Sequence, residues 1–444
     1  MKKLDNLFIG FMLFSMFFGA GNLIFPPFLG AQSGTNFWLA IAGFIVTGVG
    51  LPIAVIFAVS LVKGGAQAMG DRVHPIFSTA FMVAVYLSIG PFLAIPRNTN
   101  VAFEMGVTPF LSGSTNTSLY LLVYSFVFFA LVYVISLNPT KMEKYMGRFI
   151  APVLLLSMVV LIVVGLVQLD APLQSPSELY NSGAFFTGFL EGYNTMDALA
   201  SLAFGIVILT AIQKKGVQGR VQLRTNTFKA AVVAGVLLTV VYVSLGLIGA
   251  KMAVNGSFED GTDILSSVAT LLFGQSGTAL LGVIFTLACF TTVVGLTTAC
   301  GQYFSKLIPK TSYRTVVLLV SLVGFTLSNL GLAQILKVSV PFLVTAYPLT
   351  IVLILLAFFS RLFSHSKKVY ATTMLFTGVF AALSGLETFG VDLGPIDAVR
   401  NMLPFSSVGL EWVAPALVGF VVGLLFTKFT KQETVVEKSE LKAS

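Results

Sequence analysis

The sequence predicts an all-α membrane protein of about twelve transmembrane helices, built as a 5 + 5 inverted repeat with two appended helices. Three observations lead to this fold class. Apolar residues make up 56% of the 444 residues and charged residues only 10%, whereas soluble proteins carry about 25% charged residues. The apolar residues also gather in runs of membrane-spanning length. Two of these runs are interrupted in the middle by glycine and polar residues.

The apolar runs set the expected order of the helices. A helix needs roughly 20 consecutive apolar residues to cross the hydrocarbon core of a bilayer, and polar residues separate the runs here. We expect one transmembrane domain over residues 1–427, with inverted repeats at about 5–168 and 185–360, further helices at about 369–427 and a polar tail at 428–444. The twelve spans are expected at about 5–29, 37–62, 76–96, 118–137, 149–168, 185–212, 228–250, 275–305, 314–332, 335–360, 369–390 and 406–427.

The positions of Lys and Arg predict the orientation, because cytoplasmic loops collect basic residues. With the N-terminus inside, 22 of the 26 Lys and Arg residues fall in cytoplasmic segments. The other four, on or near the outer side, are Arg97, Lys251, Lys337 and Arg400. Both termini are therefore expected in the cytoplasm. The formal net charge of +8 reflects this topology, and nucleic-acid binding is a poor second interpretation.

Two spans are interrupted, and their positions indicate an inverted repeat. The first is interrupted at Gly19–Asn22, which Pro26 and Pro27 follow, and the sixth at Glu191–Asp197. The second interruption comes five spans after the first, and because five is odd the second unit starts on the opposite face of the membrane. Paired interrupted helices of this kind indicate the binding site of a secondary transporter. The break residues expected at the site are Gly19, Ala20, Gly21, Asn22, Gly192, Tyr193, Asn194 and Thr195.

The chemistry of a helix break favours a zwitterion and a cation as ligands. Each break frees N–H and C=O groups that are costly when they stay unpaired in lipid. A carboxylate suits the N-terminal end of a half-helix, and a cation suits the freed carbonyl oxygens. Gly19 and Gly21 permit the unwound backbone and the close approach of a ligand. The alternative is ordinary packing of helices through small residues, but Asn22 is a costly polar group at this depth and favours a site.

A second set of oxygen atoms comes from the eighth span. Thr291 and Thr292 follow Ala288 at helical spacing, so the three residues share one helix face. Their hydroxyl and carbonyl oxygens could complete the shell of a hard cation such as sodium. The alternative is that the hydroxyls bond back to carbonyl groups of the preceding turn.

The interruption of the sixth span also carries two acidic residues, Glu191 and Asp197. A carboxylate inside the membrane costs roughly 2.5 to 3.5 kcal/mol on insertion scales and marks a functional candidate. Both residues are therefore candidates for coupling to an ion. For Glu191 the alternative is a position in water at the outer boundary. Asp197 has three open roles, which are pairing with a substrate ammonium group, binding a proton, or capping the inner half-helix.

Three segments of the chain resemble one family of transporters. They are LDNLFIGFMLFSMFFGAGNLIFPPFLG from Leu4 to Gly30, EGYNTMDALASLAFGI from Glu191 to Ile206, and ACFTTVVGLTTACGQYF from Ala288 to Phe304. The sequence is similar to the bacterial branched-chain amino acid:cation symporter family, the transport system II carrier proteins, over nearly its whole length. The resemblance implies uptake of leucine, isoleucine and valine across the inner membrane, driven by sodium in many members and by protons in others.

A more remote resemblance implies roles for individual residues. GAGNLIFP, from Gly19 to Pro26, is similar to the Gly-x-Gly-Asn stretch before Phe-Pro in the neurotransmitter:sodium symporters, which share the leucine-transporter-like 5 + 5 repeat. It implies that the Ala20 and Gly21 amides face the substrate carboxylate and that the Asn22 side-chain oxygen binds sodium. This chain lacks the arginine before Phe-Pro, so the arginine gate of that family is not carried over. A second sodium ion is implied at the carbonyl oxygens of Ser15, Phe18 and Ala288 and the hydroxyls of Thr291 and Thr292.

The leading hypothesis is a sodium-coupled importer of branched-chain amino acids that works by alternating access, and a proton-coupled symporter is the alternative. In an apolar pocket each buried CH₂ group contributes about 0.8 kcal/mol. Tyr86, Tyr193 and Phe204 are candidate lining residues, with ordinary packing as the alternative. A channel is less favoured, because no ring of charges or carbonyl filter motif appears.

An enzyme is not expected, because the sequence holds no metal-ligand pair or nucleophile constellation. The two cysteines, Cys289 and Cys300, lie in one apolar segment, which indicates neither a disulfide framework nor a thiolate metal cluster. We therefore expect no cofactor. Sodium is the expected co-transported ion, and the expected partners are leucine, isoleucine, valine and the lipid bilayer.

Overall fold

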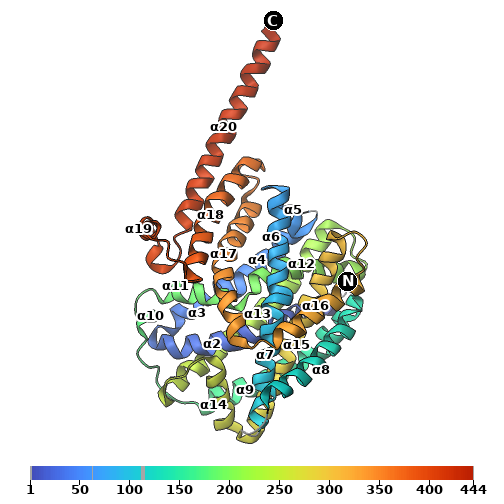
Figure 1. Cartoon of the computed structure of the whole chain (residues 1–444), viewed down its shortest axis with the longest axis vertical. Coiled ribbons are helices and arrows are strands. Elements are labelled where there is room, and N and C mark those ends of the chain that lie inside the picture. The colour runs from blue at the N-terminus through green and yellow to red at the C-terminus, as the bar shows by residue number, and fades with distance from the viewer. Residues whose placement is uncertain (1–2, 63, 112–115, 444) are drawn as a thin grey trace. The chain divides into compact units, whose positions relative to one another are not determined.

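The computed structural model describes residues 3–62, 64–111 and 116–443, and this part of the chain is helical without a β-strand (Figure 1). Contacts divide it into two compact units, Met1–Leu61 with Val85–Ser339 and Val62–Ala84 with Val340–Ser444. Nine helical stretches in the described part are long and apolar enough to cross a membrane, and shorter apolar helices accompany them. The predicted all-α membrane fold is confirmed.

Each of the twelve predicted spans overlaps helices of the structure. Helices of the first unit are α1 Lys3–Phe17, α2 Ala20–Ser33, α3 Phe37–Ile45, α4 Leu51–Leu61, α7 Ala94–Gly106, α8 Thr117–Ser136, α9 Ala151–Gln168, α10 Glu178–Asn181, α11 Ala184–Glu191, α12 Asp197–Lys214, α13 Arg220–Met252, α14 Gly261–Phe273, α15 Gln275–Leu307 and α16 Tyr313–Ser328. Helices of the second unit are α5 Gly65–Gly70, α18 Lys367–Thr388, α19 Pro395–Asn401 and α20 Val413–Ala443. Both units include residues of α6 Pro75–Leu87 and α17 Leu332–Phe359.

The first span is interrupted where the sequence predicts. α1 ends at Phe17 and α2 begins at Ala20. Between the two half-helices Gly19 is extended, with φ −119° and ψ −161°, and its N–H donates to Asn22 Oδ1 at 3.0 Å. The first amides of a helix have no partner in a preceding turn. The Asn22 side chain supplies one such partner and stabilises the start of α2.

The sixth span is interrupted over a longer stretch. α11 ends at Glu191, a 3-10 turn covers Gly192–Thr195, and α12 begins at Asp197. Between them Met196 has a φ of 65°, which residues other than glycine rarely adopt. Strained backbone of this kind persists where surrounding contacts impose it, and it gathers at ligand sites and switch regions. The two interruptions give the broken helices 1 and 6 of the predicted repeat.

The third span bends between α6 and α7. A π-helical turn covers Ser88–Phe92, and within it Gly90 has φ −91° and ψ −126°. A Cβ added at Gly90 would lie 2.7 Å from Cys300 Sγ of α15, so a larger residue here would require the Cys300 side chain to move. α7 begins immediately after the bend and brings Asn98 against Ala20 at the first-span interruption.

Glycine also lets α2 and α13 lie against each other. A Cβ at Gly249 of α13 would clash with the carbonyl group of Pro27, and one at Gly30 of α2 would clash with the carbonyl group of Gly246. Small residues permit such close approach of helix backbones in membranes. The contact holds α13 beside α2 and brings Tyr242 to the first-span interruption.

A cluster of charged side chains connects the start of α1 with the end of α12. Lys215 Nζ lies 3.1 Å from Asp5 Oδ1 and 2.8 Å from Glu143 Oε2, and Arg148 Nε donates to Glu143 Oε1 at 3.0 Å. Burial lowers the pKa of Lys215, but the hydrogen bonds and charges of Glu143 and Asp5 outweigh it and raise the pKa above its ordinary value. Lys215 is therefore charged at neutral pH and stabilises this contact.

In the second unit, α18 and α20 pack side by side as the two appended helices. Gly423 of α20 permits the approach, because a Cβ there would lie 2.6 Å from Val369 Cα. Near the other end of α18, Arg400 of α19 pairs with Glu387, and its Nε lies 3.7 Å from Glu411 Oε1.

Candidate functional site

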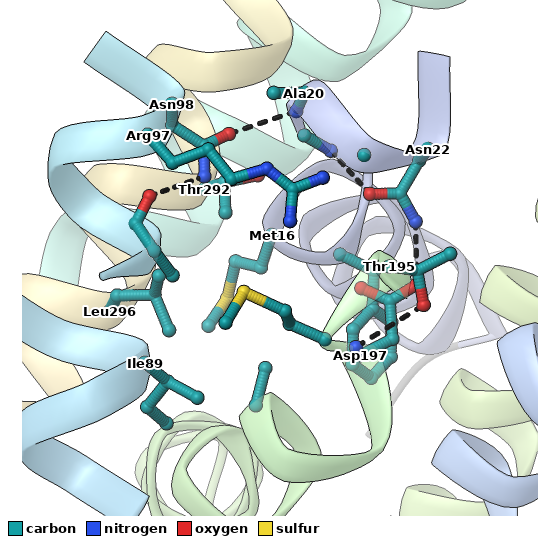
Figure 2. A pocket seen from close by; sticks show the side chains of 16 residues that line it. Met16, Ala20, Asn22, Ile89, Arg97, Asn98, Thr195, Asp197, Thr292 and Leu296 are labelled. Carbon is teal, nitrogen blue, oxygen red and sulfur yellow. Dashed lines mark hydrogen bonds between the residues drawn. The ribbon is translucent and has the colours of Figure 1, made fainter. Parts of the chain in front are cut away.

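A pocket lies where the interruptions of the first and sixth spans meet (Figure 2). Residues of α1, α2, α12 and α15 surround it, together with the bend of the third span and the start of α7. Two of the lining residues are charged, Arg97 and Asp197. The lining residues are Met16, Phe17, Gly19, Ala20, Gly21, Asn22, Ile89, Ala94, Arg97, Asn98, Thr195, Met196, Asp197, Ala200, Thr292 and Leu296.

Asn22, Asp197 and Tyr242 form a hydrogen-bonded cluster between α2, α12 and α13. Asn22 Nδ2 donates to Asp197 Oδ2 at 2.5 Å and also to the phenol oxygen of Tyr242. Tyr242 in turn donates to Asp197 Oδ2 at 3.2 Å. Because Asn22 Oδ1 accepts from Gly19 N–H, both ends of the amide have partners that set its orientation. The carboxylate of Asp197, a residue only 3% exposed, thus lies between the two interruptions.

The start of α2 lines the pocket with its first amides. Ala20 N–H donates to Asn98 Oδ1 at 2.9 Å, as Figure 2 shows. A Cβ at Gly21 would lie 2.9 Å from Arg97 Nη2 and 3.1 Å from the carbonyl oxygen of Asn194, so the absence of a side chain is what permits this approach. The positive end of the α2 dipole and the Arg97 guanidinium therefore act on the same side of the pocket.

Arg97 lies in the pocket, which corrects its expected position on or near the outer side. The residue is 4% exposed, and its Nη1 donates to the carbonyl oxygen of Asn194 at 3.0 Å. Its Cζ lies 5.2 Å from the ring centroid of Phe25, within the range of a cation–π interaction. The third span was expected to end at residue 96, which put Arg97 in the loop that follows. In the structure this helical stretch continues through α7, so Arg97 lies within it.

The structure separates the two acidic candidates. Asp197 lines the pocket, whereas Glu191 is outside the lining, and its Oε2 accepts from Asn194 Nδ2 at 3.0 Å. The first amide of α12 donates to Thr195 Oγ1 at 3.4 Å, so Thr195 contributes to capping this half-helix. Gly192 packs against Thr47 of the second span. The sixth-span interruption thus gives the pocket one carboxylate.

The aromatic residues proposed as lining residues pack elsewhere around the site. Tyr86 stacks on Tyr303 with ring centroids 4.0 Å apart. Phe204 lies edge-on to Phe17 at 5.4 Å, and the ring of Tyr193 lies 5.7 Å from that of Phe189. None of the three proposed residues belongs to the pocket lining. The apolar side chains that do line it are those of Met16, Phe17, Ile89, Ala94, Met196, Ala200 and Leu296.

Three of the residues implied as sodium ligands, Ser15, Ala288 and Thr291, lie together between α1 and α15. Thr291 Oγ1 lies 2.6 Å from the carbonyl oxygen of Ser15 and 3.0 Å from those of Ala288 and Leu287. The two bonds to Ala288 and Leu287 are the bonding back to the preceding turn that the sequence offered as the alternative. The bond to Ser15 connects α15 to α1 and brings a further carbonyl oxygen to the same place. Thr292 Oγ1 is buried without a hydrogen-bond partner in the described structure, and Thr292 lines the pocket.

A comparison with known protein families shows which family the chain belongs to. The family described as "Branched-chain amino acid transport protein" matches residues 2–430. The chain belongs to this family. Its similar members include the branched-chain amino acid permease BraB of Bacillus subtilis, 44% identical over 96% of each chain. The branched-chain amino acid transport system 2 carrier protein of Pseudomonas aeruginosa is 39% identical over 96% of each chain.

Solved structures show which known fold the chain resembles. The chain is similar to Mhp1, a nucleobase-cation-symport-1 transporter in a closed conformation, with a TM-score of 0.61 at 16% identity, covering 96% of this chain and 93% of that one. MhsT in complex with L-phenylalanine gives a TM-score of 0.51 at 14% identity, covering 95% and 98%. These likenesses confirm the predicted leucine-transporter-like fold. The similar family members are named permeases and carrier proteins, and their names describe transport, not catalysis.

The sequence did not predict three residues that the structure places at the site. Arg97 and Asn98 line the pocket, and Tyr242 bonds to Asn22 and Asp197. A signal for the first two was present, because IPRNTN from Ile95 to Asn100 places a basic residue and two amides beside a proline in an otherwise apolar span. Polar and ionisable residues inside a span face the protein interior and mark functional sites. For Tyr242 the sequence carries no such signal, since a lone tyrosine in a long apolar helix is ordinary.

Proposed function

We propose that this protein imports leucine, isoleucine and valine across the bacterial plasma membrane, coupled to sodium, by alternating access. The observation that carries the proposal is the pocket at the two helix breaks. It combines the start of α2 and a buried carboxylate, that of Asp197, with an apolar wall from Met16, Ile89 and Leu296. Family membership supports the substrate class, because the similar members are named for branched-chain amino acids.

The two charged ends of an amino acid match the polar side of the pocket. The substrate carboxylate binds at the first amides of α2, where the helix dipole favours an anion. In the structure Asn98 Oδ1 accepts from Ala20 N–H, and a carboxylate oxygen of the substrate would take over this hydrogen bond. The substrate ammonium group pairs with Asp197. This residue belongs to the sixth-span interruption but contacts Asn22 of the first-span interruption and lines the pocket.

The apolar wall selects the side chain of the substrate. Burial contributes about 0.8 kcal/mol for each CH₂ group, so leucine, with three more carbons than alanine, binds roughly 50-fold more tightly on this account. Lysine or glutamate would bring a second charge against methionine, isoleucine and leucine side chains, where it has no partner and is costly to bury. The pocket therefore favours aliphatic side chains over charged ones.

Sodium coupling is supported by the oxygen cluster between α1 and α15. The carbonyl oxygens of Ser15 and Ala288 already lie within 3.0 Å of Thr291 Oγ1, and Thr292 Oγ1 lacks a partner in the described structure. Neutral oxygens of this type suit a hard cation. A sodium ion here would connect α1 to α15, and so couple ion binding to the position of the first half-helix. The interruptions allow the half-helices to tilt during alternating access.

Uptake by the purified full-length protein in proteoliposomes tests the function. Labelled L-leucine is expected to accumulate against its gradient when sodium is high outside, and to stop accumulating when choline replaces sodium. Unlabelled isoleucine and valine should compete, whereas lysine and glutamate should not. Uptake that does not saturate would indicate a channel. Equal uptake without sodium that follows an imposed pH gradient would show proton coupling, and Asp197 would then become the leading candidate for the coupling residue.

Both termini are expected in the cytoplasm, because 22 basic residues fall in the segments assigned to that side and, with Arg97 in the pocket, three on the other. With Cys289 and Cys300 replaced, a cysteine in place of Ser444, which lies outside the described residues, should resist an impermeant thiol reagent added to intact cells. It should react after the cells are opened. Ready labelling in intact cells would overturn this orientation.

A further inference from the structure

Arg97 is a permanent cation buried in the pocket. A guanidinium group stays protonated in proteins, and inside a membrane such residues pair with other groups and mark substrate or ion pathways. Arg97 and Asp197 are the two charged residues among those that line this pocket. Together they give the pocket one positive and one negative group, and no net formal charge. A zwitterion carries one group of opposite charge for each of them, whereas an uncharged ligand carries neither.

The contacts of Arg97 direct its guanidinium between the two helix breaks. On one side Nη1 is held by the carbonyl oxygen of Asn194, and the group also lies over the ring of Phe25. On the other side Nη2 lies close to Gly21 of α2, where an added Cβ would be 2.9 Å away. The planar group is thus oriented by the protein before a ligand arrives. Arginine is suited to two-point recognition of a carboxylate through its rigid fork of donors.

The pocket also has a polar group that still needs a partner. Thr292 is 7% exposed and its hydroxyl has no hydrogen-bond partner in the described structure. An added Cβ at Gly19, the residue before α2, would lie 2.8 Å from this hydroxyl oxygen and 2.6 Å from Asn98 Oδ1. Buried polar groups are normally hydrogen-bonded. The Thr292 hydroxyl is therefore available to a ligand or an ion on this side of the pocket.

We propose that Arg97 binds the substrate carboxylate and, opposite Asp197, makes the transporter selective for zwitterions over amines and carboxylic acids of the same shape. This inference rests on the proposed function. An amine that lacks the carboxylate offers Arg97 no anionic group, and an acid that lacks the amino group offers Asp197 no cationic group. A site built around a polar partner strongly rejects analogues that lack it.

Competition against labelled L-leucine in proteoliposomes tests this assignment. The competitors are L-leucine, 3-methylbutylamine, which is leucine without its carboxylate, and 4-methylpentanoic acid, which is leucine without its amino group. For the wild type, the half-inhibitory concentrations of both analogues should exceed that of leucine by at least about 100-fold. In Arg97→Gln the value for leucine should rise by about 30-fold or more, and the value for the amine should change by less than about threefold. The ratio of amine to leucine should therefore collapse.

Two further variants keep the result decisive. Arg314→Gln makes the same chemical change at an exposed residue of α16, and should leave the ratio at its wild-type value. Arg97→Lys keeps the charge but loses the fork, so its ratio should fall between those of wild type and Arg97→Gln. If Arg97→Gln does not fold, the Arg97→Lys ratio decides, together with thermal stabilisation of the purified variant by leucine and by the amine.

The outcomes separate the inference from the function on which it rests. Absence of leucine transport by the wild type would refute the proposed function. Leucine transport with a wild-type ratio in Arg97→Gln would refute the role of Arg97 alone, as would an unchanged ratio in Arg97→Lys where only that variant folds. A collapsed ratio with normal sodium dependence supports Arg97 as the residue that binds the carboxylate.

Discussion

Replacing Asp197 by Asn is expected to lower the rate of leucine uptake by at least about 100-fold, because the substrate ammonium loses its charged partner in a buried site. The exchange is nearly isosteric, so the loss reflects charge and hydrogen bonding. It also disturbs the cluster, since Asp197 Oδ2 accepts from both Asn22 and Tyr242, and an amide nitrogen at that position cannot accept. Initial rates at several leucine concentrations measure the effect.

Glu191→Gln is the matched control for this substitution. Glu191 belongs to the same interruption, but it lies outside the pocket lining and bonds to Asn194. Its replacement should change uptake by less than about threefold. Thermal unfolding of both purified variants should show that they fold. Similar losses for the two variants, or near wild-type uptake by Asp197→Asn, would contradict the role proposed for Asp197.

Replacing Thr291 and Thr292 together by Val is expected to raise the sodium concentration for half-maximal uptake by at least about 30-fold, because hydrogen bonds or contacts to a charged group contribute about 1.5 to 3 kcal/mol each. Valine keeps the branched shape and removes only the two hydroxyls. Maximal uptake at saturating sodium should fall much less, because neither change removes an apolar wall residue. Leucine uptake measured over a range of sodium concentrations gives both quantities.

Two variants of the same helix check the specificity of this effect. Replacing Thr291 and Thr292 by Ser restores both hydroxyls and should restore most of the sodium affinity. Thr297→Val removes a fully buried hydroxyl of α15 that does not line the pocket, and should leave sodium dependence within about twofold of wild type. An unchanged sodium requirement in the Thr291 and Thr292 double variant would show that the cation binds elsewhere.

Local composition determined the fold class and the positions of the two broken helices. Glycine next to asparagine at Gly19–Asn22 and the polar stretch Glu191–Asp197 cannot continue an apolar membrane helix without help from neighbouring groups. The structure accordingly ends α1 at Phe17 and begins α12 at Asp197. The distribution of Lys and Arg likewise predicts the orientation in the membrane from the sequence alone, because it depends only on which loop each basic residue occupies. These properties need no knowledge of which helix packs on which.

Only the tertiary structure decided which side chains share the pocket. Asn22 meets Asp197 and Tyr242 across 175 and 220 residues of sequence, and the bend at Gly90 brings Arg97 to the same place. A membrane helix is apolar on its lipid-facing and protein-facing sides alike, so hydrophobic periodicity does not reveal which face points inward. For this reason Tyr86 and Phe204 were expected in the pocket but pack around it, and Arg97 was expected outside but lines it. Close helix contacts, made possible by glycines such as Gly249, set those faces.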